Sequence, residues 1–374
     1  MKPLFSILIV LFHVSFCYSA DYSKIDKQSA SVPPNLKTAE EIAVYLTKNL
    51  NNPTDKTRAI YYWISHNIRY DMEMLTSNKS VTTTQELVVD VLKRRQGVCA
   101  NYAELFHTCC KSVGIESYVI NGFTKFDGKL ATISHAWNGV VIDGKYYFID
   151  VTWAAGQEDN GKYIHEFNDQ YFLIQPSEFI KTHMPFDPIW QFSNNPLSNK
   201  EFESNNFAKL NKPSDYNFSD SIKSLISLKP IDKLIRETSR ITKSGLTNSL
   251  VREFASMNQQ NIVTLKYNQG IEFLNKSVED FNFYILSKNK QFDGTNMKDE
   301  KILEILSDSR KNLEAAENEI KFLNSDNGNI NRMIKDMEIS INNMKTKLVV
   351  EDTFTAKYIK TWKPFRIFMF YTLR

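Results

Sequence analysis

The sequence predicts two parts: an α+β domain in which helices pack on an antiparallel sheet, and an all-helical C-terminal region that contains an antiparallel helical hairpin. Three observations predict this division. Helical spacing of apolar residues dominates 38–113, and short β-branched and aromatic runs follow between 117 and 151. Beyond 217 the helical pattern returns without a clear strand pattern. Helices followed by antiparallel strands are typical of α+β domains, and 374 residues exceed the usual size of one domain.

Composition and charge exclude several classes of function. A hydrophobic content of 42%, with 25 Phe and 17 Tyr, is ample for a large core and is not that of a disordered protein. The net charge of +3 is small, so no nucleic-acid partner is expected. The six histidines are scattered, and no Cys/His cluster has zinc-ligand spacing. The sequence therefore predicts no metal and no cofactor.

The N-terminus is typical of a signal peptide. Lys2 supplies a positive charge, residues 4–16 form an apolar run, and 17–19 end in small residues that suit signal peptidase. The apolar run is too short to favour a membrane-spanning helix. We therefore expect removal of 1–19 and a mature protein that is secreted, periplasmic or on the cell surface. A lipoprotein acylated at Cys17 is the less favoured alternative.

Four helices are expected before the sheet. Thr38 and Glu41 have the spacing of a capping box, and Gly114 is well placed to end the last helix in a left-handed conformation. The helices are predicted from Thr38 toward Leu50, from Pro53 to about Asn67, from Thr84 to Arg94 and from Cys99 to about Val113.

The period then changes to that of strands. Asp143-Gly144 is a two-residue hairpin turn between two of them. The predicted strands are Ser117–Phe123, His135–Ile142 and Lys145–Val151, with Tyr171–Ile174 as a candidate for a fourth.

The hairpin brings a histidine and an aspartate together. With Asp143-Gly144 as the turn, His135 lies opposite Thr152, and Asp150 is the diagonal neighbour of His135 on the same face of the ribbon. Their backbone positions are then roughly 7–8 Å apart, a range over which a carboxylate reaches an imidazole. A structural His–Asp hydrogen bond is one interpretation. The other is a catalytic pair, in which the carboxylate orients the ring and stabilises the imidazolium.

Cys99 lies where a reactive thiol is expected. A cysteine in the first turn of a helix faces unsatisfied N–H groups and the positive end of the helix dipole, and both favour the thiolate that attacks carbonyl carbon. Gly97 lets the backbone approach a substrate closely. A buried cysteine that packs as a small hydrophobic residue is equally consistent with this stretch alone. Cys109 and Cys110 lie further along the same helix, and no disulfide framework is visible.

Several short sequence blocks follow one another along the chain. Each block alone is a weak signal, but their combination in this order is highly specific for one family. They are Tyr62-Trp63-Ile64 with Asn67-Ile68-Arg69-Tyr70-Asp71, Gly97-Val98-Cys99, Tyr102-Ala103, Ser134-His135-Ala136-Trp137-Asn138, Asp150-Val151-Thr152-Trp153, and His183-Met184-Pro185-Phe186-Asp187-Pro188-Ile189-Trp190-Gln191. Their combination spans roughly Leu36 to Phe192. It resembles the transglutaminase-like superfamily of papain-related cysteine folds, and within it the kyphoscoliosis-peptidase-like branch. Asn101 stands where many relatives carry glycine.

The resemblance implies a catalytic triad. Cys99 is then the nucleophile, His135 the general base and afterwards the acid, and Asp150 the residue that orients His135. The backbone N–H of Cys99 is the natural donor to an oxyanion. Gln96 and the indole N–H of Trp63 are both candidates for a second donor.

This triad implies acyl transfer: thiolate attack on an amide, a thioester intermediate, and capture by water or an amine. We expect hydrolysis, which makes the protein an exported cysteine peptidase or amidase with a protein or peptide substrate. Two alternatives stay open. Capture by a lysine amine makes it a protein-glutamine cross-linking transglutaminase, and loss of turnover makes it a catalytically silent interaction protein. Retention of Cys, His and Asp together argues against the silent alternative, because a lost activity places no demand on them.

The second part is expected after a linker at 193–217, which is rich in Asn, Ser and Pro. The transglutaminase-like domain is thus assigned to 36–192 and the helical region to 218–374. Two runs of apolar residues at 3–4 spacing, separated by a polar loop, predict the hairpin over 300–348. Helices packed within the chain are the favoured interpretation. A coiled-coil stalk that dimerises or binds a protein partner is the alternative.

The tail mixes basic and aromatic side chains. Lys360, Lys363 and Arg366 are interspersed with aromatic residues up to Tyr371, and such a mixture suits membrane interfaces. Pro364 interrupts any single amphipathic helix. We therefore expect the tail to pack on the protein's own surface, and membrane association stays open.

Overall fold

The computed structural model describes residues 21–76, 83–159, 162–292, 297–325 and 327–373. They form two compact units. The first contains the residues up to Pro185 together with Trp190–Leu197 and Glu201–Ser214, and the second contains Phe186–Ile189, Ser198–Lys200 and the chain from Asp215 onward. The predicted signal peptide, 1–19, lies outside the described residues. None of the described helices is long and apolar enough to cross a membrane.

The first unit begins with helices that enclose a buried aromatic centre, which includes Trp63 and Phe106. All four predicted helices are present. Thr38 and Glu41 form the expected capping box, and Gly114, at φ 77°, follows the last of the four. Two further short helices, α1 and α4, were not predicted. The helices are α1 (Ser23–Ser29), α2 (Ala39–Thr47), α3 (Pro53–Asn67), α4 (Met72–Thr76), α5 (Thr84–Arg94) and α6 (Cys99–Ser112).

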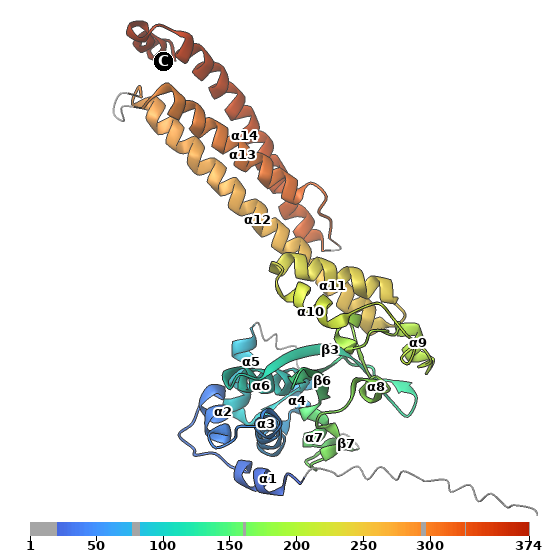
Figure 1. The fold of residues 1–374 in the computed structure, drawn as a ribbon. Coiled ribbons are helices and arrows are strands. Elements are labelled where there is room, and N and C mark those ends of the chain that lie inside the picture. The colour runs from blue at the N-terminus through green and yellow to red at the C-terminus, as the bar shows by residue number, and fades with distance from the viewer. Residues whose placement is uncertain (1–20, 77–82, 160–161, 293–296, 326, 374) are drawn as a thin grey trace, which may run out of the picture. The chain divides into compact units, whose positions relative to one another are not determined.

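A five-stranded antiparallel sheet follows, with α6 packed against its central strands (Figure 1). The strand order is β4-β3-β5-β6, and β9 also pairs with β3. The α+β prediction is therefore confirmed, with helices first and antiparallel strands after them. The strands are β3 (Glu116–Phe126), β4 (Lys129–Leu130), β5 (His135–Ile142), β6 (Lys145–Ile149) and β9 (His183–Pro185).

The predicted register of the β5–β6 hairpin is confirmed. Ile142 pairs with Lys145, and Asn138 pairs with Ile149. The two turn residues have φ angles of 50° and 74°, both positive as a type I′ turn requires. The turn therefore fixes which side chains of β5 lie beside the end of β6.

The prediction that this second strand extends to Val151 is wrong. β6 ends at Ile149, and Asp150 becomes the N-cap of a short helix, α7 (Val151–Ala155). One oxygen of the Asp150 carboxylate accepts hydrogen bonds from the backbone N–H groups of Thr152 and Trp153, at 2.9 and 3.0 Å. The first N–H groups of a helix are free donors that can satisfy a buried carboxylate, whereas those of a paired strand are not.

The predicted fourth strand at Tyr171–Ile174 is also wrong. Its first residue ends a 3-10 helix, η1 (Asp169–Tyr171), and Ile174 makes only a single bridge, with Phe148. The remaining elements of this part of the chain are β1 (Arg69–Tyr70), β2 (Gln96–Gly97), β7 (Gln157–Asp159), β8 (Lys162–Ile164), α8 (Pro176–Phe179) and η2 (Pro188–Gln191).

Gly122 lies where β3 is enclosed by β5 on one side and β9 on the other. It pairs with His135 of β5. On the other side of β5 the ladder with β6 ends at the pair Asn138–Ile149, so the expectation that His135 lies opposite Thr152 in a strand is wrong. A Cβ atom at Gly122 would lie 2.1 Å from the carbonyl oxygen of Met184 on β9. Any side chain here would therefore push apart the strands that carry His135 and His183.

The segment predicted as a linker, 193–217, contains a short helix, α9 (Asn199–Glu203), and contributes residues to both units. In the first unit, the Lys125 ammonium donates a 2.6 Å hydrogen bond to the carbonyl oxygen of Phe202. The compact unit therefore continues beyond the predicted domain end at Phe192, and α1 lies ahead of its predicted start.

The second unit is helical throughout its described residues, apart from the connections. The predicted hairpin corresponds to α13 and α14, and a long helix, α12, packs along α13 (Figure 1). The Lys288 ammonium of α12 lies 2.6 Å from the Glu351 carboxylate of α14. The helices are α10 (Phe218–Ile226), α11 (Pro230–Ser244), α12 (Ser249–Asn289), α13 (Asp299–Ile320), α14 (Gly328–Lys360) and the 3-10 helix η4 (Lys363–Leu373).

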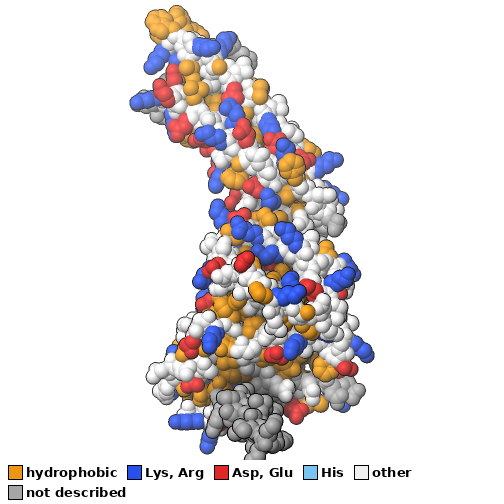
Figure 2. Space-filling view, turned by 45° about the vertical axis from the view of Figure 1, so that its right-hand side comes forward, with side chains coloured by type: hydrophobic (Ala, Val, Ile, Leu, Met, Phe, Trp, Pro, Cys, Tyr) orange, Lys and Arg blue, Asp and Glu red, His pale blue; other side chains and the backbone are white. Residues whose placement is uncertain are grey.

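The apolar stripes of the hairpin are buried inside this unit. Leu306, Leu313 and Ile341 are each no more than 2% exposed and belong to one hydrophobic cluster. Acidic and basic side chains are interspersed on the visible surface of these helices (Figure 2). This arrangement supports packing within the chain, because the residues on which a dimeric stalk would depend are already covered.

The tail packs on its own unit by one face only. The Arg366 guanidinium lies 2.7 Å from the Asp299 carboxylate. Trp362 and Phe365, however, are 70% and 54% exposed. Hydrophobic side chains gather at the end of the helical unit that carries the tail, at the top of Figure 2.

We expect Gly122→Ala to destabilise the first unit by about 1–3 kcal/mol. The new methyl group would clash with the Met184 carbonyl oxygen, which is a backbone atom and cannot move aside as a flexible side chain can. The measurement is denaturant unfolding followed by tryptophan fluorescence, since Trp63, Trp137 and Trp153 all lie in this unit. Asn121→Ala, at the neighbouring exposed position of β3, is the matched control and should change the free energy of unfolding by less than about 0.5 kcal/mol. Equal stability of the two variants would contradict the close approach of β9.

Candidate active site

Cys99 is the first residue of α6, and its thiol is partly exposed. Asn101, which is fully buried, fixes the start of this helix. Its Oδ1 atom accepts a 3.0 Å hydrogen bond from the Val98 N–H, and its Nδ2 atom donates a 3.1 Å hydrogen bond to the Leu87 carbonyl oxygen. A Cβ atom at Gly97 would lie 2.6 Å from that of Asn101. Gly97, two residues before Cys99, is therefore required by the packing of Asn101.

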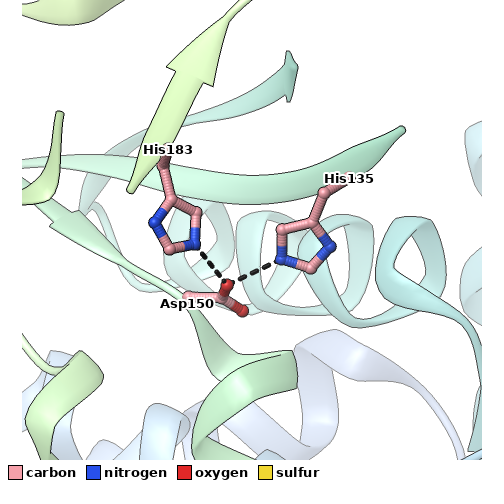
Figure 3. A group of neighbouring side chains, drawn as sticks. All are labelled: His135, Asp150 and His183. Carbon is pink, nitrogen blue, oxygen red and sulfur yellow. Dashed lines mark hydrogen bonds and ion pairs between the residues drawn. The ribbon is translucent and has the colours of Figure 1, made fainter. Parts of the chain in front are cut away.

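His135 and Asp150 are in direct contact, as the hairpin register predicted. The Nε2–H group of His135, the first residue of β5, donates a 2.7 Å hydrogen bond to Oδ2 of Asp150 (Figure 3). Asp150 is completely buried and His135 nearly so. Because Nε2 faces the carboxylate, Nδ1 is the ring nitrogen that is left for the Cys99 thiol.

The charges of these groups reinforce one another. Burial by itself lowers the pKa of His135, but the charge and hydrogen bond of Asp150, and then the interaction with Cys99, raise it to about 10. Burial by itself raises the pKa of Asp150, but His135 and, more weakly, His183 hold it well below its usual range. The carboxylate therefore stays ionised, and the ring beside Cys99 readily holds a proton.

Cys99, His135 and Asp150 all lie in a stretch of the chain that matches a known domain family. Residues 40–151 match the family model of the transglutaminase-like superfamily, and kyphoscoliosis peptidase of Mus musculus is 28% identical over 227 residues. The chain carries a transglutaminase-like domain. It is of the kyphoscoliosis-peptidase-like branch, as the order of its sequence blocks suggested.

The similarity has a defined extent. It covers 58% of this chain but only 32% of mouse kyphoscoliosis peptidase, so the chain spans about a third of the length of this relative. The Lim and transglutaminase domain protein ltd-1 of Caenorhabditis elegans is 25% identical over 250 residues, 62% of this chain and 32% of that protein. Among solved structures, the periplasmic domain of TgpA from Pseudomonas aeruginosa covers 36% of this chain and 49% of its own, with 20% identity and a TM-score of 0.26.

His183 joins the site of the transglutaminase-like domain although the sequence did not single it out. It is the first residue of β9 and is fully buried, and its Nε2 atom lies 3.2 Å from the same Asp150 oxygen that His135 contacts (Figure 3). Its sequence block was recognised, but 33 residues separate it from Asp150 along the chain. The local sequence pattern carries no signal for His183, because only the pairing of β9 with β3 brings this residue beside Asp150.

The side chains of His135, Asp150 and His183 are also of types that bind metals, and their ligand atoms lie within 4.8 Å of one another. Both Nε2 atoms point at one carboxylate oxygen, at 2.7 and 3.2 Å. Hydrogen bonds from two ring N–H groups to an ionised carboxylate account for these distances.

A cleft with a volume of about 250 Å³ opens beside His135 and is also lined by Tyr70, Met72 and Trp153. A second cavity, of about 620 Å³, shares Trp153 with it and is also lined by Phe126. The cleft therefore makes the His135 side of the site accessible from outside.

The two candidates for a second oxyanion donor differ in their surroundings. The Trp63 indole N–H is buried and has no hydrogen-bond partner among the described residues, while the Arg95 guanidinium lies 5.0 Å from the centre of the Trp63 ring. Gln96 is exposed in β2. A buried N–H without a partner costs free energy, which favours Trp63 over Gln96 as the residue to test.

We expect iodoacetamide to modify Cys99 alone in the folded protein. Cys109 and Cys110 are completely buried, and burial raises the pKa of both thiols far above the usual range. The rate at Cys99 should change little between pH 6 and 9, because the imidazolium of His135 persists up to about pH 10. Peptide mapping by mass spectrometry measures each site.

The control for this experiment is the unfolded protein, in which all three thiols should react. His135→Gln should slow the modification of Cys99 at pH 6 by about 10-fold or more, since the imidazolium that stabilises the thiolate is gone. Faster modification of Cys109 or Cys110 than of Cys99 in the folded protein would contradict the assignment.

Proposed function

We propose that the transglutaminase-like domain catalyses acyl transfer through Cys99, His135 and Asp150, and that its usual reaction is the hydrolysis of an amide in a protein or peptide. The observation that carries this proposal is the buried, ionised Asp150 on Nε2 of His135, which leaves Nδ1 for Cys99 at a helix start. Such an arrangement is that of an activated thiol nucleophile.

The first half of the reaction forms a thioester. The thiol proton of Cys99 resides on Nδ1 of His135, and the thiolate sulfur attacks the amide carbonyl carbon. The developing oxyanion accepts a hydrogen bond from the backbone N–H of Cys99, which is free because it lies in the first turn of α6. When the C–N bond breaks, the leaving amine takes the proton from His135.

The second half of the reaction releases the acyl group. Neutral His135 removes a proton from water, and the resulting hydroxide oxygen attacks the thioester carbonyl carbon. The C–S bond then breaks, and the proton held by His135 returns to the Cys99 sulfur. Asp150 stays ionised throughout and stabilises the imidazolium each time it forms.

Capture by water, by an amine, or by neither defines the three functions that the sequence left open. One incubation distinguishes the three functions. The protein is mixed with peptides from unfolded proteins in water enriched in ¹⁸O, and a fluorescent primary amine is present. Hydrolysis places one ¹⁸O atom in each new carboxyl group, while cross-linking places the amine on glutamine side chains. We expect the first result, and its loss in Cys99→Ala.

If the products carry the amine rather than ¹⁸O, the reaction is transamidation and the proposal of hydrolysis is wrong. Absence of both products, together with a Cys99 thiol that reacts no faster than a free cysteine, would leave the silent interaction protein as the function.

We also propose that the protein is exported, on the basis of the positive charge, apolar run and small residues within 1–19. Secreted material analysed by intact mass should begin near Ala20. Recovery of the protein with residues 1–19 retained would contradict cleavage by signal peptidase.

We expect Asp150→Asn to lower turnover by about 10–10³, because an amide cannot stabilise the imidazolium of His135 as a carboxylate does. The structure adds a cost in stability that the sequence did not predict. The amide NH₂ must face either the two histidine N–H groups or the backbone N–H groups of α7, so one set of buried donors loses its acceptor, at about 1–3 kcal/mol.

Asp143→Asn is the matched control, since Asp143 is exposed in the hairpin turn at positive φ, where asparagine is tolerated. Both variants are compared by the rate of Cys99 alkylation across pH and by thermal unfolding. Unchanged alkylation in Asp150→Asn together with a large loss of stability would make Asp150 a structural residue only.

A further inference from the structure

Two histidines donate to one carboxylate oxygen in the buried part of the site. Oδ2 of Asp150 accepts from His135 at 2.7 Å and from His183 at 3.2 Å, while Oδ1 accepts from the N–H groups of Thr152 and Trp153. All four interactions are made by groups with little or no contact with solvent. The proposed reaction uses only His135, so the second histidine has no role in it yet.

His183 is held rigidly in this position. Its ring stacks on Phe179 with centroids 3.9 Å apart and lies 4.5 Å from the ring of Trp153. Its other nitrogen, Nδ1, lies 2.8 Å from the Thr182 hydroxyl. A hydroxyl that donates to Nδ1 fixes the tautomer with the proton on Nε2, which is the atom that faces Asp150.

The charged and titratable groups that act on His183 are Asp150, ahead of α7, and His135, on β5. Its other close neighbours are aromatic rings, from α8, β5 and α7. Burial lowers the pKa of His183 to about 4, although the hydrogen bond that its ring donates to Asp150 and the charge of that carboxylate oppose this. At neutral pH the ring is therefore an uncharged donor, and the proton that moves in the reaction stays on His135.

We propose that His183 is a positioning residue: by donating to Asp150, it limits how strongly the carboxylate stabilises the His135 imidazolium and so sets the upper pH limit of the Cys99–His135 ion pair. The proposal deepens the proposed function and rests on it. A carboxylate whose charge is shared among four donors is a weaker partner for each of them than one shared among three. Removal of the His183 donor should therefore strengthen the Asp150–His135 interaction and let the imidazolium persist to higher pH.

The test is the pH profile of Cys99 alkylation in the full chain, which needs no known substrate. The upper inflection of this profile is the pH at which the His135 imidazolium loses its proton. In His183→Phe, which keeps a flat ring but has no donor, this inflection should rise by about 0.5–1 pH unit. In His183→Gln, whose amide can still donate, it should stay within about 0.3 unit of the wild type. Phe179→Leu weakens the packing under His183 without touching the hydrogen bond, so it should lower the unfolding temperature and leave the inflection unchanged.

Each outcome decides the matter. An unshifted inflection in His183→Phe, or shifts in His183→Gln and Phe179→Leu as large as the shift in His183→Phe, would reduce His183 to a packing residue and overturn the proposal. Should His183→Phe not fold, ¹⁵N spectra of the wild-type histidines decide instead. We expect His183 to remain neutral, with its proton on Nε2, from pH 5 to 8, and a titration near pH 6.5 would overturn the proposal.

The proposed function fails by a different observation. If Cys99 of the wild-type protein shows no enhanced reactivity below pH 8, the triad itself is wrong. If Cys99 is reactive below pH 8 but its pH profile does not depend on the residue at position 183, only the proposed role of His183 is wrong.

Discussion

The buried carboxylate of Asp150 is the interaction on which the arrangement of the site depends. A charge without solvent contact is tolerated in a protein interior only when donors surround it. Here the donors come from three elements: the first turn of α7, His135 of β5 and His183 of β9. Since each donor is useful only at hydrogen-bond distance, the same contacts that keep Asp150 ionised also hold these elements together. The same hydrogen bonds thus account both for the ionised state of Asp150 and for the local fold.

Cys99, the proposed nucleophile, lies on the helical side of the domain. Cys99 begins α6, and α6 packs on β5, where the Asn138 side chain donates a 3.0 Å hydrogen bond to the Ala103 carbonyl oxygen. This buried hydrogen bond fixes the helix against the strand that carries His135. In the proposed reaction, α6 supplies the thiol and a positive dipole end, β5 supplies the proton acceptor, and the N-cap of α7 supplies the carboxylate. The proposed reaction would therefore take place where the helices and the sheet meet.

The helical unit has a core of its own and does not contribute a residue to the triad. Its apolar stripes face inward, and ion pairs such as Lys288–Glu351 and Lys345–Glu317, both at 2.6 Å, join its helices. Gly270 of α12 lies where a Cβ atom would meet the end of the Met337 side chain at 2.8 Å, so a small residue permits the close packing of these helices. Aromatic side chains are exposed in the tail, with Trp362 70% exposed, and also after α13, where Phe322 is 86% exposed.

The sequence by itself determined the features that depend on neighbouring residues. The capping box at Thr38, the helix start at Cys99 and the turn at Asp143-Gly144 all follow from interactions over a few positions, and the turn carried the register that joins His135 to Asp150. Only the tertiary structure decided where β6 stops, why Gly97 must be small, and that His183 shares the carboxylate. His183 lies 33 residues from Asp150 and is brought there only by the packing of β9. The other two features involve near neighbours, but they depend on burial: Asn101 is held in place by the Leu87 carbonyl oxygen, and the Asp150 carboxylate caps α7 where no solvent reaches it, so no local pattern records them.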